Sequence, residues 1–110
     1  MHLLAAEPGT ISDGASAIDL GQSPGDMVVL TAADSEIACL AQAHRTALNA
    51  SRDSIPRLRL ANLLKLGHNL SVDLYLDSVI APEAKLVIVR LLGGRGYWSY
   101  GVDQLAAFGS

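Results

Sequence analysis

The stretch from Val87 to Gly101, VIVRLLGGRGYWSYG, most constrains the fold, because an apolar run breaks there into glycines, an arginine and three aromatic residues. The four aliphatic residues from Leu86 to Val89 predict a central strand that is buried on both faces. In α/β domains the loop after such a strand lies at the carboxyl edge of the sheet, where ligands and other chains are bound. We therefore expect an α/β fold with a contact or ligand loop after this strand.

The overall composition fits one globular domain. The chain has 110 residues, of which 50% are hydrophobic and 17% charged, so it can bury a single core. A net charge of -3 and mostly scattered basic residues argue against a nucleic-acid partner. The opening MHLLAAEPG turns polar at Glu7, and no apolar run approaches the ~18 residues of a membrane span. We expect a cytoplasmic protein that is neither secreted nor membrane-bound.

Hydrophobic periodicity predicts helices between most of the strands. Strands are expected at Met1–Ala6, Met27–Ala32, Arg57–Leu63 and Leu86–Val89, and helices at about 35–49, 71–80 and 101–108. Residues 10–26 are rich in turn formers, so a loop with at most a short helix is expected there. This order predicts a small Rossmann-like or flavodoxin-like three-layer domain with a mainly parallel sheet of about four strands. Leu86–Val89 is expected to be central, with Arg57–Leu63 nearer an edge.

Several single residues also have expected roles. Cys39 lies in an apolar helical pattern, which predicts a buried and unreactive thiol. His44 falls in the same apolar stripe and is expected to be a packed, hydrogen-bonded residue, since no second metal-spaced ligand accompanies it. Asp34 or Ser35 is expected to cap one helix and Ser71 the next, with Asp73 in the first turn of the latter.

The segment GGRG carries the first candidate site. Gly93, Gly94 and Gly96 permit tight turns and close approach of backbone N–H groups to an anion, with Arg95 available to pair with it. The segment lacks the Lys-Ser/Thr of a phosphate loop and the spacing of a dinucleotide fingerprint. A plain turn is the alternative interpretation, in which the glycines only connect a strand to the next element.

The aromatic residues Tyr97, Trp98 and Tyr100 carry the second candidate site, together with Arg95. Such rings suit a planar ligand or a buried protein contact, and they equally suit a cap on the domain's own core. Other polar residues are expected near strand ends or helix starts, where ligands bind in α/β folds: Glu7, Asp13, Asp34, His68 and Asp73. They form no complete catalytic constellation, so we expect no catalytic residue and no metal site in this chain.

Four segments together resemble a known family: MHLLAAEPGTISDG, MVVLTAADSEIACLA, LRLANLLKLGHNLSVDLYLD and KLVIVRLLGGRGYWSYGVDQL. They are similar to the amino-terminal end of the CobN-type large subunits of aerobic cobaltochelatases, which belong to the same family as the H subunit of magnesium chelatase. The resemblance covers essentially the whole chain. The combination of SVDLY with LLGGRGYWSYG is its most specific part.

The resemblance implies a role in ATP-dependent insertion of cobalt(II) into hydrogenobyrinic acid a,c-diamide during aerobic cobalamin synthesis. In this family the large subunit carries the tetrapyrrole, and two further subunits related to AAA+ proteins hydrolyse ATP with magnesium. The implied partners are therefore the rest of the large subunit, those two subunits and the tetrapyrrole. Family members are many times longer than this chain, and their chelation centre lies outside the similar region, so the resemblance assigns no catalytic residue here.

Three functions follow from the sequence. The chain is expected to be an amino-terminal domain that helps bind the tetrapyrrole or closes over it, without binding a cofactor or inserting metal by itself. Alternatively, its aromatic residues only dock onto the rest of the large subunit. The third possibility is a stand-alone nucleotide or phosphate binder that uses the GGRG segment.

Overall fold

The computed structural model describes residues 17, 19–50 and 54–109. Within them the chain forms a parallel sheet of three strands in the order β2-β1-β3, with β1 at Met27–Thr31, β2 at Leu58–Asn62 and β3 at Leu86–Arg90. This confirms the α/β class and the parallel sheet. The strand expected at Met1–Ala6, like Glu7 and Asp13, lies outside the described residues. The segment 19–25 contains no helix or strand, as expected for the loop before β1.

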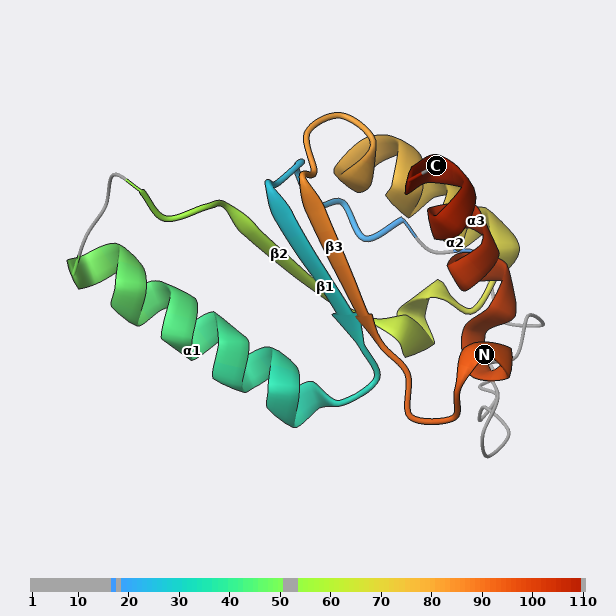
Figure 1. Cartoon of the computed structure of the whole chain (residues 1–110), viewed down its shortest axis with the longest axis horizontal. Coiled ribbons are helices and arrows are strands. Elements are labelled where there is room, and N and C mark those ends of the chain that lie inside the picture. The colour runs from blue at the N-terminus through green and yellow to red at the C-terminus, as the bar shows by residue number, and fades with distance from the viewer. Residues whose placement is uncertain (1–16, 18, 51–53, 110) are drawn as a thin grey trace.

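Helices cover both faces of the sheet and make three layers (Figure 1). Helix α1, Asp34–Ala50, lies on one face, whereas α2, Asn69–Tyr75, and α3, Ser99–Gly109, lie on the other. Helix α2 continues directly into a π-helical turn, η2, at Leu76–Ile80, and two 3-10 turns stand at η1, Leu63–Leu66, and η3, Arg95–Trp98. The three expected helices are therefore confirmed, with ends that differ by one or two residues.

The main core lies between the sheet and the layer formed by α2, η2 and α3. Its buried side chains come from β1, from η1, from the apolar stripe of α2 and η2, and from η3, and they include Val28, Leu30, Leu63, Leu66, Val72, Tyr75, Val79, Ile80 and Trp98. The helical spacing of the apolar residues in this segment predicts one buried stripe. Four of its five members are buried, namely Val72, Tyr75, Val79 and Ile80, and Leu76 is half-buried. Burial of large aliphatic side chains contributes roughly 1.5–3 kcal/mol each, so this layer stabilises the domain most.

The position expected for the strand Leu86–Val89 is wrong. In the described sheet β1 is central and β3 is an edge strand, with Leu86 and Ile88 exposed and Val87 and Val89 half-buried. An unbroken apolar run shows that both faces of a strand favour apolar surroundings, but strand order depends on long-range connections that the run does not encode. The run MVVLT of β1, which is buried from Val28 onward, occupies the centre instead.

The expected burial of Cys39 is also wrong, because its side chain is exposed. Helix α1 contacts the sheet through a half-buried stripe that includes Ile37, Ala41 and Ala47, and none of its residues is fully buried. Cys39 follows Ile37 by two positions, which places it about 200° around the helix from that residue. His44 is half-buried in the stripe and donates a hydrogen bond from Nε2 to the carbonyl oxygen of Pro56, 2.7 Å away, as expected for a packed residue.

Ser71 is expected to cap the second helix, but the capping residue is His68, three positions earlier in the chain. His68 precedes α2 in an extended conformation, and its Nδ1 accepts a hydrogen bond from the backbone N–H of Leu70 at 3.0 Å. Ser71 lies fully buried inside the helix. An imidazole nitrogen thus takes the role that a serine oxygen usually has at this position. His68 is a capping residue, in agreement with its expected place in a turn.

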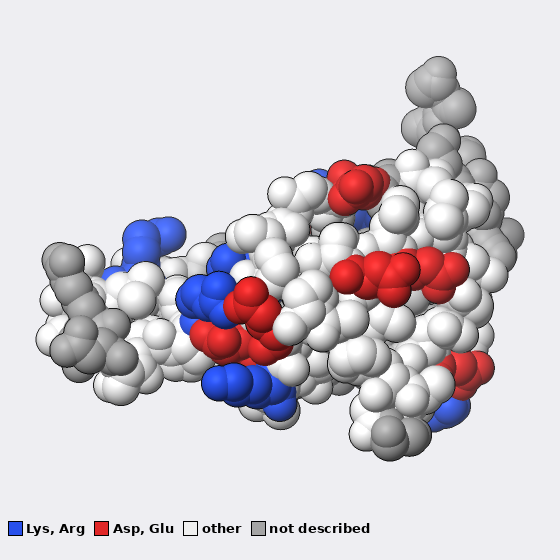
Figure 2. All heavy atoms as spheres, turned by 90° about the horizontal axis from the view of Figure 1, so that it is seen from above, with Lys and Arg blue, Asp and Glu red and all other residues white. Residues whose placement is uncertain are grey.

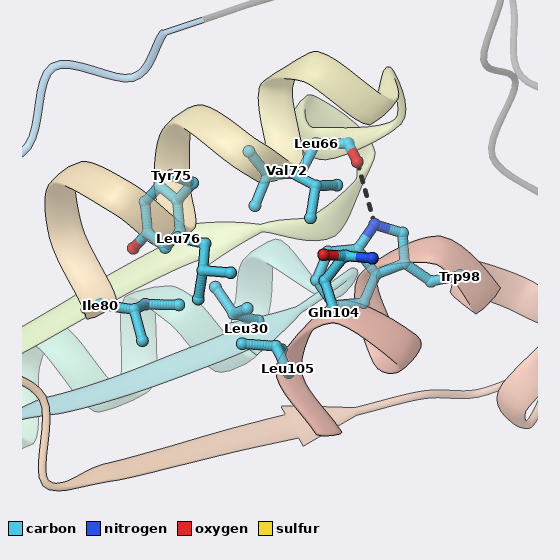
Figure 3. Close-up of a pocket in the computed structure, with 9 residues that line it drawn as sticks. All are labelled: Leu30, Leu66, Val72, Tyr75, Leu76, Ile80, Trp98, Gln104 and Leu105. Atoms are coloured by element: carbon cyan, nitrogen blue, oxygen red, sulfur yellow. Dashed lines mark hydrogen bonds between the residues drawn. The ribbon is translucent and has the colours of Figure 1, made fainter. Parts of the chain in front are cut away.

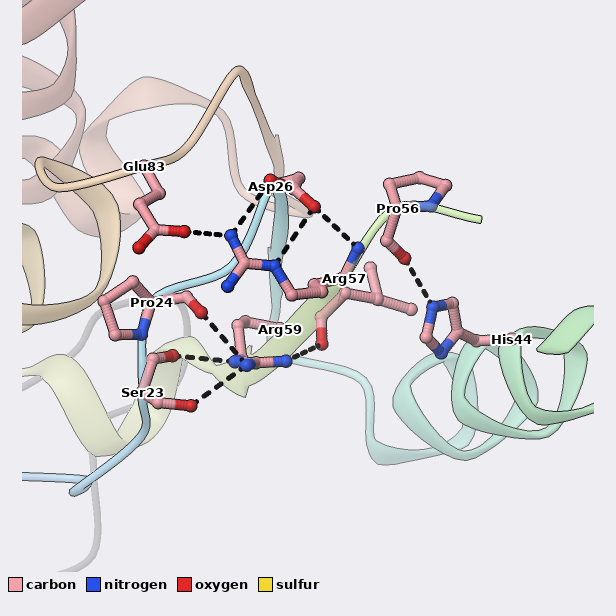
Figure 4. Close-up of polar contacts among 9 residues, drawn as sticks. Ser23, Pro24, Asp26, His44, Pro56, Arg57, Arg59 and Glu83 are labelled. Atoms are coloured by element: carbon pink, nitrogen blue, oxygen red, sulfur yellow. Dashed lines mark hydrogen bonds and ion pairs between the residues drawn. The ribbon is translucent and has the colours of Figure 1, made fainter. Parts of the chain in front are cut away.

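Charged side chains tie the amino ends of the strands together (Figure 4). The guanidinium of Arg57, just before β2, pairs with Asp26, just before β1, at 3.1 Å, and also with Glu83, which precedes β3. Arg59 donates to Ser23 and to the carbonyl oxygen of Pro24. Figure 2 looks onto this end of the molecule, where basic and acidic side chains lie next to one another. The charge of Arg57 is therefore balanced by carboxylates of the protein, and these contacts hold the amino ends of the strands in place.

Candidate functional site

The loop between β3 and α3 is built as the sequence indicates, with its glycines at the turn. Gly94 has φ +75°, a left-handed conformation that favours glycine, and its carbonyl oxygen accepts from the N–H of Tyr97 at 3.1 Å. A Cβ on Gly93 would lie 3.2 Å from the ring of Tyr97, so that ring packs over the backbone of Gly93. Gly96 has open space around it. These contacts define a tight turn into η3.

Trp98 belongs to the core. It is 5% exposed, and its indole N–H donates to the carbonyl oxygen of Leu66 at 2.9 Å. Figure 3 shows the indole beside Leu66 and Gln104, at one end of a very small cavity of about 10 Å³ that is otherwise lined by apolar side chains. The burial supports the core-cap interpretation for this residue, since a ring in this position offers no face to a ligand of the domain as described.

Tyr100 and Arg95 are each held by a carboxylate. The hydroxyl of Tyr100 donates to Asp73 on α2 at 2.8 Å, and this hydrogen bond, together with some desolvation, raises the pKa of the phenol. Arg95 donates to Asp103 on α3 at 2.6 Å, with both side chains more than half exposed. Asp73 therefore has a structural partner. The first of these contacts joins α3 to α2, and the second joins the loop to α3.

Two side chains of the loop, those of Leu92 and Arg95, are largely open to solvent. Leu92 is 80% exposed, the side chain of Arg95 is 65% exposed, and Tyr97 is half-buried. At the start of the loop, the side chain of Arg90 is also more than half exposed. Together these four residues, Arg90, Leu92, Arg95 and Tyr97, form what we call the rim. It combines apolar surface with two guanidinium groups, which suits an amphipathic molecule that carries carboxylates.

A polar cluster at the carboxyl ends of the strands was not identified from the sequence. Thr31, at the end of β1, donates to Glu36 at 2.6 Å, and Arg90, at the end of β3, pairs with the same carboxylate at 2.8 Å. The hydrogen bond from Thr31 and the charge of Arg90 lower the pKa of Glu36. In the sequence, Thr31 and Arg90 lie near the ends of two apolar runs, but the register that brings these residues together is a property of the fold.

Strand β2 contributes its last residue, Asn62, to the same edge of the sheet. Its side-chain amide donates to Asp34 on α1 at 2.8 Å, and its side-chain oxygen accepts from the N–H of Leu64. Asp34 thus meets the carboxyl edge, as expected, while His68 lies at the start of α2 with its own capping role. Each of these polar groups has a partner within the protein. The cluster therefore orders the carboxyl edge of the sheet, next to the rim.

Neither a metal cluster nor a membrane helix is found in the part of the chain that the structure describes. No group of three or more His, Cys, Asp or Glu side chains there is arranged to hold a metal ion. No helix among these residues has the length and apolar character to cross a bilayer. The GGRG segment also lacks the lysine that a phosphate loop places directly after its glycines.

Comparison with known proteins gives two relatives that share one name. The chain is 48% identical over 107 residues to the aerobic cobaltochelatase subunit CobN of a Sinorhizobium species, and 43% identical over 107 residues to that of Pseudomonas aeruginosa. Each match covers 97% of this chain but only 8% of the relative. No protein-family model matches the chain, and no solved structure matches it significantly. By sequence the chain therefore corresponds to a short part of the CobN-type subunits of aerobic cobaltochelatases.

Proposed function

We propose that this chain acts as the amino-terminal domain of a CobN-type large subunit and helps that subunit bind its tetrapyrrole or close over it. The complete enzyme would insert cobalt(II), as substrate, into hydrogenobyrinic acid a,c-diamide with ATP and magnesium handled by two AAA+-related subunits. The observation that carries the proposal is the 43–48% identity to CobN over 97% of the chain. Because the chain spans only 8% of those relatives, the reaction itself is assigned to the remainder of such a subunit.

The rim supports a contact with the tetrapyrrole. A corrin precursor is a broad, largely apolar ring with carboxylates at its periphery. Leu92 offers exposed apolar surface. Arg90 and Arg95 are each paired with one carboxylate of the protein, but both side chains are more than half exposed, and a guanidinium has further N–H groups that pair with carboxylates. Tyr97 adds a half-buried aromatic ring next to Gly93. These residues, rather than the buried Trp98, are the substrate contacts that we propose within the GGRGYWSYG segment.

A direct titration tests this role. Hydrogenobyrinic acid a,c-diamide is added to the purified chain while its visible absorbance and the fluorescence of Trp98 are followed. We expect saturable binding that is at least ~10-fold weaker in the double variant Arg90→Ala/Arg95→Ala, because two charge-assisted contacts are lost. Leu70→Ala is the matched surface control, since Leu70 is exposed on α2. Equal binding by the double variant and the control would contradict a substrate role for the rim.

A second candidate is a docking module without ligand contact, and the exposed apolar side chain of Leu92 favours it. In that case the wild-type chain shows no saturable spectral change with the tetrapyrrole but still associates with the rest of a CobN-type subunit. A parallel titration with ATP and magnesium addresses the stand-alone nucleotide binder. Saturable ATP binding that is lost in Arg95→Ala would favour this third function over the other two.

A further inference from the structure

Strand β3 has a free edge in the described sheet, since its one partner there is β1. A free edge presents unpaired backbone N–H and C=O groups and is a ready template for another strand. Natural edge strands usually protect themselves with charges, prolines or bulges. On β3 only the final residue, Arg90, is charged, while Leu86 is 50% and Ile88 39% exposed. The side chains of β3 are therefore as apolar as those of an interior strand, although β3 lies at the edge of the described sheet.

Two apolar grooves flank this edge, one on each face of the sheet. The first, which we call the α1 groove, has a volume of about 360 Å³ and is lined by Val29, Glu36, Cys39, Leu40, Ile88 and Arg90. The second, the α3 groove, has a volume of about 590 Å³ and lies between β3 and α3, with Val87, Val89, Val102, Leu105 and Phe108 in its lining. A strand placed beside β3 would meet apolar side chains on both of its faces.

The course of α3 indicates where such a strand would start. Helix α3 runs back along the sheet opposite to β3, and its last residues lie near the beginning of that strand (Figure 1). Phe108 and Gly109 line the α3 groove together with Ala84, Lys85 and Leu86. In a right-handed β-α-β unit, the strand after the helix begins at this end and runs parallel to the first strand. The geometry is that of a β-α unit ready for its next strand.

We propose that the free edge of β3 takes a fourth, parallel strand, apolar on both faces, from the part of a CobN-type subunit that follows α3. The inference rests on the proposed function in so far as it treats the chain as one domain of that long subunit. The matched region is 8% of each relative, so most of such a subunit lies outside it. A second copy of this chain is the competing occupant, and it would pair at the same edge by two-fold symmetry.

Cys39 is a built-in probe of this surface, because it is exposed, lines the α1 groove and is the only cysteine of the chain. The purified chain is mixed with the Pseudomonas aeruginosa relative from which its own matching region has been deleted. Association is measured by sedimentation, and the reaction of Cys39 with a disulfide reagent is timed. A Cys39→Ser chain provides the background from the relative's thiols. We expect a complex in which Cys39 reacts at least ~10-fold more slowly.

Two edge variants and a matched control locate the contact. Leu86→Lys and Ile88→Lys place a charge on the edge without altering a buried side chain, and each is expected to weaken association at least ~10-fold. Leu70→Lys is the control, since Leu70 is 49% exposed and lies on α2 away from this edge. It should bind as the wild type does. Circular dichroism melting of all three variants establishes that they fold.

Each other outcome overturns the inference. Failure of the wild-type chain to associate with the truncated relative would contradict it, as would a complex in which the edge variants behave like Leu70→Lys. Protection of Cys39 in the chain alone, rising with concentration and lost in Ile88→Lys, would assign the edge to a second copy. The tetrapyrrole titration is independent of these measurements, so a failed substrate role and a failed docking edge are distinguished.

Discussion

Gly101 faces the indole ring of Trp98 so closely that a Cβ at position 101 would overlap the ring. The two residues lie one helical turn apart, where η3 passes into α3. The glycine is therefore required for packing, not for an unusual backbone conformation.

We expect Gly101→Ala to destabilise the domain by roughly 1–3 kcal/mol, since overpacking must displace Trp98 and its hydrogen bond to Leu66. Alanine favours a helix by only ~1 kcal/mol over glycine, which is insufficient to compensate. Urea unfolding followed by circular dichroism measures the difference. Gly96→Ala is the control, because a Cβ there meets nothing within 4 Å. Equal stability of the two variants would show that Trp98 is packed elsewhere.

Cys39 is expected to react readily in the native state. Its side chain is exposed on α1, so a disulfide reagent reaches it without unfolding. The rate for the native chain should lie within ~10-fold of the rate in denaturant, and the single cysteine makes the readout unambiguous. A thiol that reacts only after denaturant is added would restore the burial expected from the apolar pattern.

The stability of the domain is expected to fall in alkaline solution because of Tyr75. Burial raises the pKa of this phenol from 10.0 to about 12, and its hydroxyl donates to Gln22 at 2.7 Å. The folded state therefore holds a proton that the unfolded chain loses above pH 10, so the stabilisation is complete below that pH and disappears as the pH rises toward 12. At 1.36 kcal/mol per unit, the loss is about 2–3 kcal/mol.

Tyr75→Phe removes this contribution and should flatten the decline of the unfolding free energy between pH 10 and pH 12. Tyr97→Phe, at a half-buried position in the loop, serves as the control for the loss of a hydroxyl. If both variants kept the wild-type slope, the alkaline loss would belong to other groups.

Acid is expected to weaken the amino end of the sheet through Asp26. Hydrogen bonds from the side chain and the backbone of Arg57 lower the pKa of this carboxyl from 3.8 to about 2. A lowered pKa contributes stability that is present above pH 3.8 and is lost as the pH falls toward 2. Thermal midpoints of wild type and Asp26→Asn should therefore converge between pH 4 and pH 2. Asp103→Asn, in the exposed pair with Arg95, should change the midpoint little at any pH.

The local elements were largely predictable from the sequence because their signals are local. The aliphatic runs predicted β1 and β3, and the spacing of Val72, Tyr75, Val79 and Ile80 predicted the buried side of α2 and η2. Within the candidate site, the turn at Gly94 followed from its residue type. Propensity and periodicity act within a few residues of the chain, so one sequence is enough to read them.

The remaining features depend on contacts between distant residues. Nothing local to Leu86–Val89 indicates that β1 lies between it and β2. The pairing of Glu36 with Arg90 joins residues 54 positions apart. The burial of Trp98 in the core could not be predicted either, because it depends on contact with Leu66, which lies 32 residues earlier. Strand order and long-range contacts thus set the site, and both are tertiary properties.

The central position of β1 has a consequence for the growing chain during translation. Met27 pairs with Leu58 and with Leu86, residues that are made 31 and 59 positions later. At roughly 5–20 residues per second, the ribosome needs about 3–12 seconds to add the second of these partners. During that time the apolar residues Val28 to Leu30 lack at least one neighbouring strand, and an unpaired strand edge of this kind is open to mispairing.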